Sequence, residues 1–168
     1  MNKKISRKYL EIKSLKDLKE VLKPSGNFLL ELIDSKNFQL NKFFYKQIGN
    51  KYRWVDRLEW SNKNWISYIS KESLLTFVLK ENKNPVGYFE LIIHEDKNEC
   101  EVAYFGILEE YFGKKLGGFL LSEAIKKSFA LGIQRIWLHT SSLDHKNALN
   151  NYLARGMTVF KSEVRTNI

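Results

Sequence analysis

Apolar and polar residues alternate or recur at helical spacing along the chain, and these two patterns predict its strands and helices. Alternating segments rich in aromatic and β-branched residues predict strands. They are YLEIK from Tyr9, Phe28 to Asp34, LLTFVLKE from Leu74, PVGYFELIIHE from Pro85, and Glu99 to Leu108. Only the short turns NKNP and EDKN separate the last three strands, so we expect an antiparallel meander.

Helical spacing occurs between these strands. SLKDLKEVL, from Ser14, predicts a short helix that Pro24 ends. LNKFFYKQIG, from Leu40, is helical by the spacing of its apolar residues. SNKNWISYIS has Ser61 as its N-cap and carries Trp65, Ile66 and Ile69 on one side of the helix.

The C-terminal part changes to the order strand, helix, strand. YFGKKLGG leads into a helix that ends at Gly132, and the strand RIWLHT follows from Arg135, which predicts a βαβ unit. A second helix, HKNALNNYLAR, is predicted between Asp144 as N-cap and Gly156, before a last strand, MTVFKSEVR. The apolar face of the first helix consists of Leu120, Leu121, Ala124, Ile125 and Ser128.

The composition predicts one folded unit with a single core. The chain has 168 residues, of which 43 % are hydrophobic, so we expect one domain over 1–168, with 1–26 as an extension of strand and helix. No apolar run is long enough to span a bilayer and no signal-like apolar block follows the Lys-rich N-terminus, so we expect a cytoplasmic protein. Cys100 is the only cysteine, and His94, His139 and His145 lack paired ligand spacing, so we expect no disulfide and no metal.

The chain carries a formal net charge of +9 at pH 7. Such a charge favours polyanions, among them nucleic acid, a membrane surface or a nucleotide cofactor. The basic residues are mostly scattered lysines, without an arginine-rich block, zinc-finger spacing or an aromatic RNA-binding pattern. A nucleic-acid partner is therefore the less favoured alternative, and no membrane partner is expected.

The stretch YFGKKLGGFLL, Tyr111 to Leu121, joins a strand to a helix through glycines. The first N–H groups of a helix have no partner within the helix, and the positive end of its dipole lies behind them. Gly113, Gly117 and Gly118 let the backbone curl around an anion, and the two lysines of the stretch add attraction. The spacing fits neither a Walker A loop nor the dinucleotide fingerprint, so a tight structural connection is the alternative.

From Glu101 to Phe160 the chain resembles the GNAT superfamily of N-acetyltransferases. The loop of that family runs Gln or Arg, two residues, Gly, one residue, Gly or Ala, and Phe112 to Gly117 lies over this pattern. A later signature of Ala, three residues, Tyr, three residues, Gly matches Ala148, Tyr152 and Gly156. The run VAYFGILEEYFGKKLGG…LHTSSLDHKNALNNYLARG is also similar to a bacterial subgroup of uncharacterised GNAT proteins.

Two loop positions depart from the family pattern. Phe112 stands where Gln or Arg is usual, and Lys115 stands where the first glycine is usual. A lysine costs more free energy than a glycine at a positive φ. At a negative φ, Lys115 would cost nothing and would add a charge beside the pyrophosphate.

The resemblance implies an α/β fold in which helices flank a mixed, mostly antiparallel sheet with a C-terminal βαβ unit. It implies acetyl-CoA as cosubstrate, with the pantetheine arm pairing like an extra strand against Ile107 and Leu108. His145 stands where the family often has an asparagine that contacts this arm. The pyrophosphate would lie against the loop residues Phe112, Gly113, Lys114, Lys115, Leu116, Gly117 and Gly118.

Acetyl transfer to an amine needs a proton acceptor, because an alkylamine with a pKa of about 10.4 is mostly protonated at neutral pH. Glu101 is the candidate, by its similarity to the glutamate base of the histone-acetylating branch, and an exposed strand carboxylate paired with a lysine is the alternative. A turn centred on Asp96 and Lys97 places Glu90 diagonally near Glu101 on the same face, as a second-choice base.

Tyr152 matches the tyrosine that protonates the leaving thiolate in the family. The alternative is an ordinary apolar helix stripe of Leu149, Tyr152 and Leu153.

The acceptor side is assigned to KYRWVDRLEW, Lys51 to Trp60. Trp54, Asp56 and Trp60 could hold an amine through cation–π and carboxylate contacts, or the tryptophans could belong to the core. We therefore expect an N-acetyltransferase that moves acetyl directly from acetyl-CoA to a primary amine. Cys100 lies early in its strand and has no positional support as a covalent carrier. A non-catalytic module that binds CoA or another anion remains the main alternative.

Overall fold

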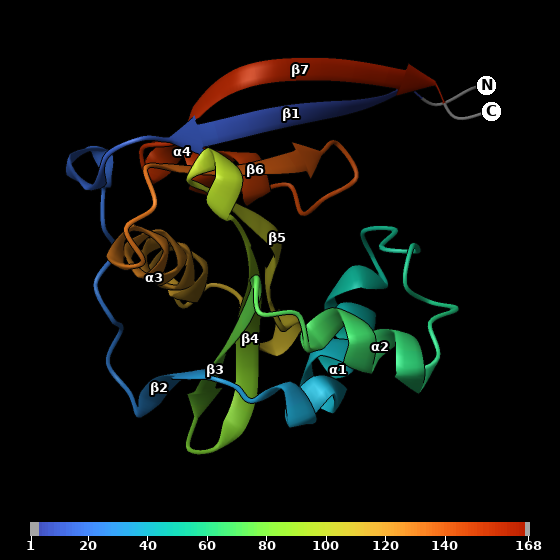
Figure 1. Ribbon diagram of the computed structural model, residues 1–168. Coiled ribbons are helices and arrows are strands. Elements are labelled where there is room, and N and C mark those ends of the chain that lie inside the picture. Colours follow the sequence, from blue (N-terminus) through green and yellow to red (C-terminus); the bar gives the residue numbers. More distant parts are fainter. Residues whose placement is uncertain (1–3, 167–168) are drawn as a thin grey trace.

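The computed structural model describes residues 4–166, which form a seven-stranded sheet in the order β2-β3-β4-β5-β6-β1-β7 (Figure 1). The strands are β1 (Lys4–Ile12), β2 (Phe28–Leu32), β3 (Leu74–Glu81), β4 (Asn84–His94), β5 (Glu99–Ile107), β6 (Arg135–Ser141) and β7 (Thr158–Thr166). The α-helices are α1 (Phe38–Gly49), α2 (Asn62–Ile69), α3 (Leu116–Ala130) and α4 (Ala148–Ala154). Short 3₁₀ turns occupy Leu15–Asp17, Ser35–Asn37, Glu95–Lys97 and Glu109–Tyr111.

The predicted meander is confirmed, because β2, β3, β4 and β5 pair antiparallel in chain order. Between β4 and β5, Ile92 lies opposite Glu101, which centres the turn between Asp96 and Lys97 as expected. Asn98 closes this turn in the left-handed region, at φ 54°. An asparagine tolerates that region better than most residues do.

The predicted βαβ unit is also confirmed, with α3 joining the parallel strands β5 and β6. Their pairing is short: only Glu99, Cys100 and Glu101 have partners, at Arg135, Ile136 and Trp137. Beyond Glu101 the two strands separate. This separation creates the opening in which the candidate site lies.

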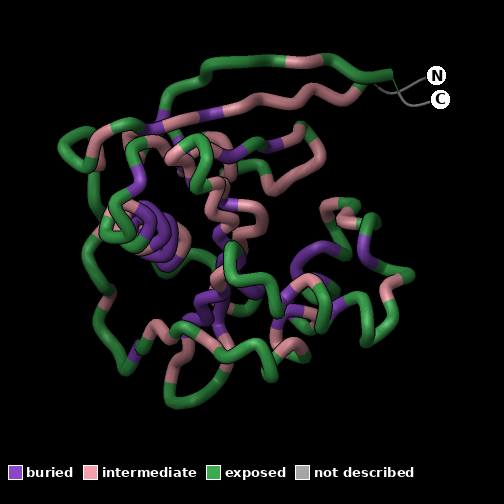
Figure 2. Tube along the Cα trace, in the orientation of Figure 1, coloured by how far each residue is buried: buried purple, intermediate pink, exposed green. Residues whose placement is uncertain are grey.

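Helices cover both faces of the sheet. The predicted face of α3 is buried on one side of the sheet and belongs to the same core cluster as Phe89, Leu91 and Cys100 (Figure 2). On the other side, α1 packs against Val78 and Tyr88, and α2 lies against α1 and β3 (Figure 1). Burial raises the pKa of the Cys100 thiol to about 11, so this cysteine is a structural residue at neutral pH.

The N-terminal strand is longer than the sequence predicts and lies in the sheet, between β6 and β7. Residues Arg7 to Ile12 pair antiparallel with β6, and Lys4 to Glu11 pair with β7. β6 therefore has β5 on one side and β1, from the N-terminal end of the chain, on the other. Within residues 4–166, no helix combines the length and apolar content needed to cross a bilayer.

Two sequence predictions about helix boundaries are wrong. The helix expected from Ser14 is only the turn Leu15–Asp17, because the backbone that follows bonds elsewhere: Lys19 N donates to Arg155 O and Val21 N to Ser122 Oγ. Asp144 does not cap the second C-terminal helix.

The carboxylate of Asp144 instead closes the turn after β6. It accepts hydrogen bonds from Thr140 Oγ1 at 2.7 Å and Ser141 N at 2.9 Å. As a result, α4 starts at Ala148 behind Asn147.

Two glycines with positive φ give a test of this packing. Gly156 has φ 101°, and a Cβ there would lie 2.1 Å from Asp17 O, whereas Gly132 has φ 82° and open space around it. We expect Gly156→Ala to lower the free energy of unfolding by roughly 3 kcal/mol and Gly132→Ala by about 1 kcal/mol. Urea denaturation measures both, and equal losses would show that the turn at Asp17 does not pack on Gly156.

Candidate active site

A cavity of about 1120 Å³ opens where β5 and β6 separate. Its walls come from β5, β6, the N-terminal end of α3, the start of α4 and the segment between α1 and α2. Twelve of the predicted site residues line it: Trp54, Asp56, Glu101, Ile107, Phe112, Gly113, Lys115, Leu116, Gly117, Gly118, His145 and Tyr152. Glu90, Leu108, Lys114 and Trp60 do not.

The loop before α3 exposes backbone donors to the cavity. No side chain caps α3, whose first backbone hydrogen bond runs from Phe119 N to Lys115 O. The N–H groups of Leu116, Gly117 and Gly118 therefore lack partners within the helix and sit at the positive end of its dipole. A Cβ added to Gly113, at φ 79°, would meet nothing within 4 Å. The loop is an open concave donor set of the kind that holds phosphate.

Lys115 adopts the left-handed conformation, at φ 62° and ψ 14°. The φ of Lys115 is thus positive, not negative, and this conformation costs roughly 1 kcal/mol relative to an unstrained one. The same geometry explains why a glycine is usual there. Lys114 does not line the cavity; its Nζ lies 5.4 Å from the centroid of the Tyr111 ring, which does.

The open edge of β5 offers fewer backbone groups than the sequence predicts. Leu108 N donates to Val86 O at 2.9 Å, and Leu108 O accepts from Tyr111 N at 2.9 Å, so the expected pairing of Leu108 with the pantetheine arm is wrong for its N–H. Successive N–H groups of a strand point to opposite edges. Ile107 N–H therefore points to the separated side, toward β6.

His145 stands at the mouth of the cavity between two aromatic rings. Its ring centroid lies 4.9 Å from that of Phe112 and 6.0 Å from that of Tyr52, both in edge-to-face geometry. Asn147 N donates to His145 Nδ1 at 3.0 Å. The neutral ring consequently carries its proton on Nε2, which remains available as a donor.

Glu101 lies at the last paired position of β5 and β6, where the cavity begins. Burial raises the pKa of its carboxyl above 4.5, and the charge of His94 opposes this shift. A raised pKa makes a carboxylate a better proton acceptor near neutral pH.

Glu90 lies on the same face, two residues along β4 from the partner of Glu101, as the register predicts. It is fully buried, with no exposed surface, and does not reach the cavity. Its oxygens accept from Arg57 Nη1 at 3.2 and 3.1 Å, Asn41 Nδ2 at 2.9 Å and Tyr68 OH at 3.0 Å. Four hydrogen bonds engage this carboxylate, so it has no proton-accepting role toward a ligand in the cavity.

Tyr152, on α4, is 8 % exposed and packs edge-to-face on Phe105 at a centroid distance of 6.3 Å. Burial raises the pKa of its phenol well above 10, with a further contribution from the charge of Asp144. The hydroxyl therefore keeps its proton at any working pH, and Tyr152 is one of the residues that line the cavity.

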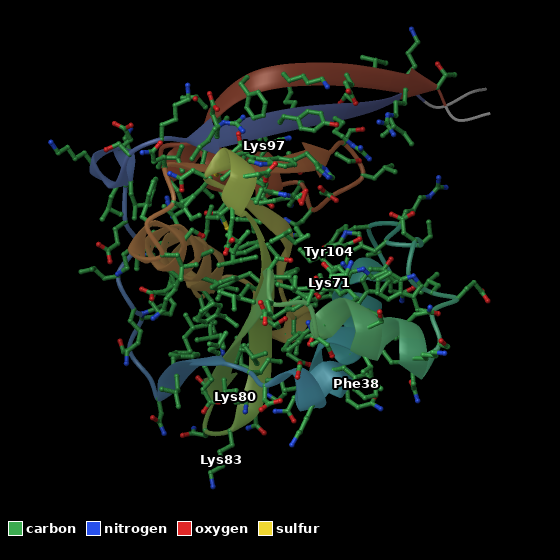
Figure 3. The ribbon with its side chains drawn as sticks, viewed as in Figure 1. Phe38, Lys71, Lys80, Lys83, Lys97 and Tyr104 are labelled. Carbon is green, nitrogen blue, oxygen red and sulfur yellow. The ribbon has the colours of Figure 1, made fainter. Side chains whose placement is uncertain are left out.

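The cavity wall formed by the segment between α1 and α2 contains a charged residue that sequence analysis did not select as a site residue. Arg57, between α1 and α2, is surrounded by rings: its Cζ lies 4.0 Å from the Tyr68 centroid and 4.2 Å from the Tyr104 centroid. Figure 3 shows Tyr104 on the side of the sheet that α1 and α2 cover. Trp54 packs edge-to-face on Tyr104 at 4.9 Å, whereas Trp60 contacts Arg57 without reaching the cavity. The sequence feature that could have indicated Arg57 is its position between Trp54 and Trp60.

Comparisons with known proteins agree with this geometry. The sequence model of the Acetyltransferase (GNAT) family matches residues 35–157. A search of curated proteins found no match.

Solved structures share the fold at low identity. A GCN5-related N-acetyltransferase from Sphaerobacter thermophilus is 13 % identical with a TM-score of 0.71, over 96 % of this chain and 51 % of that one. A functionally unknown conserved protein from Staphylococcus epidermidis is 18 % identical with a TM-score of 0.64, over 96 % and 60 %. PaiA N-acetyltransferase from Thermoplasma acidophilum, solved with coenzyme A, is 20 % identical with a TM-score of 0.51, over 63 % and 74 %.

This chain spans between half and two thirds of the length of the first two structures. The family match covers well over half of the present sequence and includes the β5–α3–β6 unit with its glycine loop. The chain belongs to the GNAT acetyltransferase family.

Proposed function

We propose that this protein transfers an acetyl group from acetyl-CoA directly to a primary amine. The observation that carries the proposal is the separation of β5 and β6 beside the uncapped start of α3. The separated strands offer an unpaired strand edge to the amide-containing pantetheine arm, and the start of α3 offers N–H donors to the pyrophosphate. Members of this fold generally bind acetyl-CoA, and the PaiA structure holds coenzyme A.

The cofactor side uses backbone groups more than side chains. The N–H groups of Leu116, Gly117 and Gly118 would hold the pyrophosphate, with the charge of Lys115 beside it. Ile107 N–H lies on the open edge, where it can pair with the arm or stabilise the thioester oxygen as negative charge develops there. His145 adds one donor at the mouth through Nε2.

The amine would approach on the Glu101 side. Attack of its nitrogen on the thioester carbon forms the new C–N bond, and Glu101 accepts the nitrogen-bound proton directly or through a water. Collapse of the tetrahedral adduct then breaks the C–S bond and releases the thiolate. The raised pKa of Glu101 suits this role, since burial destabilises the charged carboxylate and so favours its uptake of a proton.

Tyr152 would stabilise the departing thiolate. Full proton transfer from a phenol whose pKa exceeds 10 to a thiolate whose conjugate acid has a pKa of about 8.5 is unfavourable. We therefore assign Tyr152 a hydrogen bond to the developing sulfur charge, with the final proton coming from solvent.

A thermal-melt titration tests the cofactor assignment. Acetyl-CoA at about 100 times its Kd should add about 2.7 kcal/mol, which corresponds to roughly 5–10 °C in Tm for a chain of this size. ATP and inorganic phosphate serve as controls for a general anion site. Equal shifts with ATP would favour the anion-binding module instead.

Glu101→Gln tests the base. Below the pKa of Glu101, log kcat/KM of the wild type should fall with a slope of about two, because both the carboxyl and the amine must lose a proton. In the variant the slope should be about one and the rate lower throughout. Glu99→Gln, on the same strand but paired with Arg135 outside the cavity, should keep the wild-type profile.

The same variant gives a stability readout. Because folding raises the pKa of Glu101, its ionisation destabilises the fold as pH rises above 4.5, and the full penalty is present above the raised pKa. Glu101→Gln should therefore be more stable than the wild type at neutral pH, and the difference should vanish below 4.5. An unchanged pH–rate profile together with unchanged stability would remove Glu101 from this role.

Tyr152→Phe tests the donor. We expect kcat to fall about 100-fold while KM for acetyl-CoA changes little, because the hydroxyl acts on charge that forms only in the transition state. Tyr9→Phe removes a phenol that bonds Glu163 away from the cavity and should leave kcat unchanged. Full kcat in Tyr152→Phe would make Tyr152 a packing residue.

A further inference from the structure

Arg57 is a buried cation with unused hydrogen-bonding capacity. Its side chain is 6 % exposed, and its hydrogen bonds all run from Nη1 to Glu90 within the described residues. Burial lowers the pKa of Arg57, but the charge of Glu90 and smaller contributions from the neighbouring tyrosines together outweigh burial and raise this pKa, so the guanidinium stays charged. The Tyr68 and Tyr104 rings fix its position.

The other edge of this guanidinium reaches the cavity. Arg57 Nε and Nη2 donate to no group in residues 4–166, yet neither belongs to the enclosed polar atoms that lack a partner. Those atoms are Asn41 Oδ1, Tyr88 OH, Trp137 Nε1 and Arg155 Nε. Since Arg57 also lines the cavity, its unused N–H groups face that space. The Nε and Nη2 pair is the fork that matches the two oxygens of a carboxylate.

The charges around the cavity favour an anionic ligand over a polycationic one. The basic residues lining it are Arg7, Arg53, Arg57, Lys115, Lys146 and Arg165, and the acidic ones are Asp56, Glu101 and Asp144. Lys115 and Lys146 lie at the end that would hold the pyrophosphate. Arg57 is paired with Glu90 and Arg165 with Glu163, so the excess of positive charge that a ligand meets comes from Arg7, Arg53, Lys115 and Lys146.

We propose that Arg57 binds a carboxylate of the acceptor, so that the substrates are amines that also carry a carboxylate, such as amino acids. The assignment rests on the proposed function and specifies its acceptor class. The guanidinium is already desolvated and held by Glu90 and two rings, so a carboxylate meets a donor pair that loses little freedom on binding. The amine of the same molecule would then lie inside the cavity, whose wall includes Glu101.

Equilibrium binding of matched pairs tests this assignment. Amino acids and ω-amino acids are compared with their carboxamides by calorimetry, with and without coenzyme A. We expect the best-binding acid to bind the wild type at least about tenfold tighter than its amide. This comparison uses the unmodified protein and does not depend on any variant folding.

Arg57→Lys should reduce the preference for the acid to within about threefold, because lysine keeps the charge but lacks the planar fork. Arg53→Lys, an exposed arginine of the same cavity, is the matched control and should keep the preference. Thermal melts check that both variants fold.

The outcomes separate this inference from the proposed function, which thiol release from acetyl-CoA measures independently. Equal or tighter binding of the amides, no binding of any acid at millimolar concentration, or equal losses in both variants would overturn the assignment of Arg57. Acetyl transfer to amines without a carboxylate would do the same and leave the acetyltransferase standing. Acid-selective binding without acetyl transfer would support Arg57 and remove the proposed function.

Discussion

Parallel pairing of β5 and β6 stops after Glu101 and Trp137, and the site depends on that interruption. Residues of β5 beyond this point keep their hydrogen bonds to β4 on one edge and leave the other edge open. The gap cannot close by moving β6 alone, because β1 holds the other edge of β6 over six residue pairs. An unpaired strand edge and a cavity are thus built into the sheet, between strands that are both anchored from outside.

A buried ion pair fixes the opposite wall. Glu90 on β4 bonds Arg57 from the segment between α1 and α2, together with Asn41 on α1 and Tyr68 on α2. Burying two charges rarely adds net stability, even when every oxygen is engaged. Here the pair links α1, α2 and the sheet at one point, so it determines where the helices lie and leaves one edge of Arg57 at the cavity.

Much of the fold could be predicted, since local patterns specify it. The meander, the turn at Asp96 and the apolar face of α3 follow from alternation, turn residues and helical spacing. The pairing of β1 between β6 and β7 could not be predicted, because long-range strand pairing leaves no mark on spacing. The segment after Ser14 has helical spacing, but its N–H groups bond Arg155 and Ser122 instead.

The candidate site was likewise predictable where local sequence patterns specify it, and not where it depends on contacts between distant residues. Motif spacing pointed to the loop and Tyr152, and similarity to a branch of the family pointed to Glu101; all three lie on the cavity wall. It could not show that Glu90 is buried against Arg57 or that Leu108 N–H is already bonded, because both depend on three-dimensional partners. The strain at Lys115 was likewise a question of backbone conformation, which only the structure answers.

The arrangement of charge also bears on how an amine becomes nucleophilic. An ammonium group with a pKa of about 10.4 is disfavoured beside like charges, which lower its pKa. In the proposed reaction Arg53 would act in that direction, whereas Glu90 offsets most of the charge of Arg57, and the partly buried Glu101 would accept the released proton. A carboxylate on Arg57 would partly neutralise this effect, but it would also hold the amine near Glu101. Under this proposal, positioning and deprotonation would come from the same few charged residues, and their balance would set which amines the site can use.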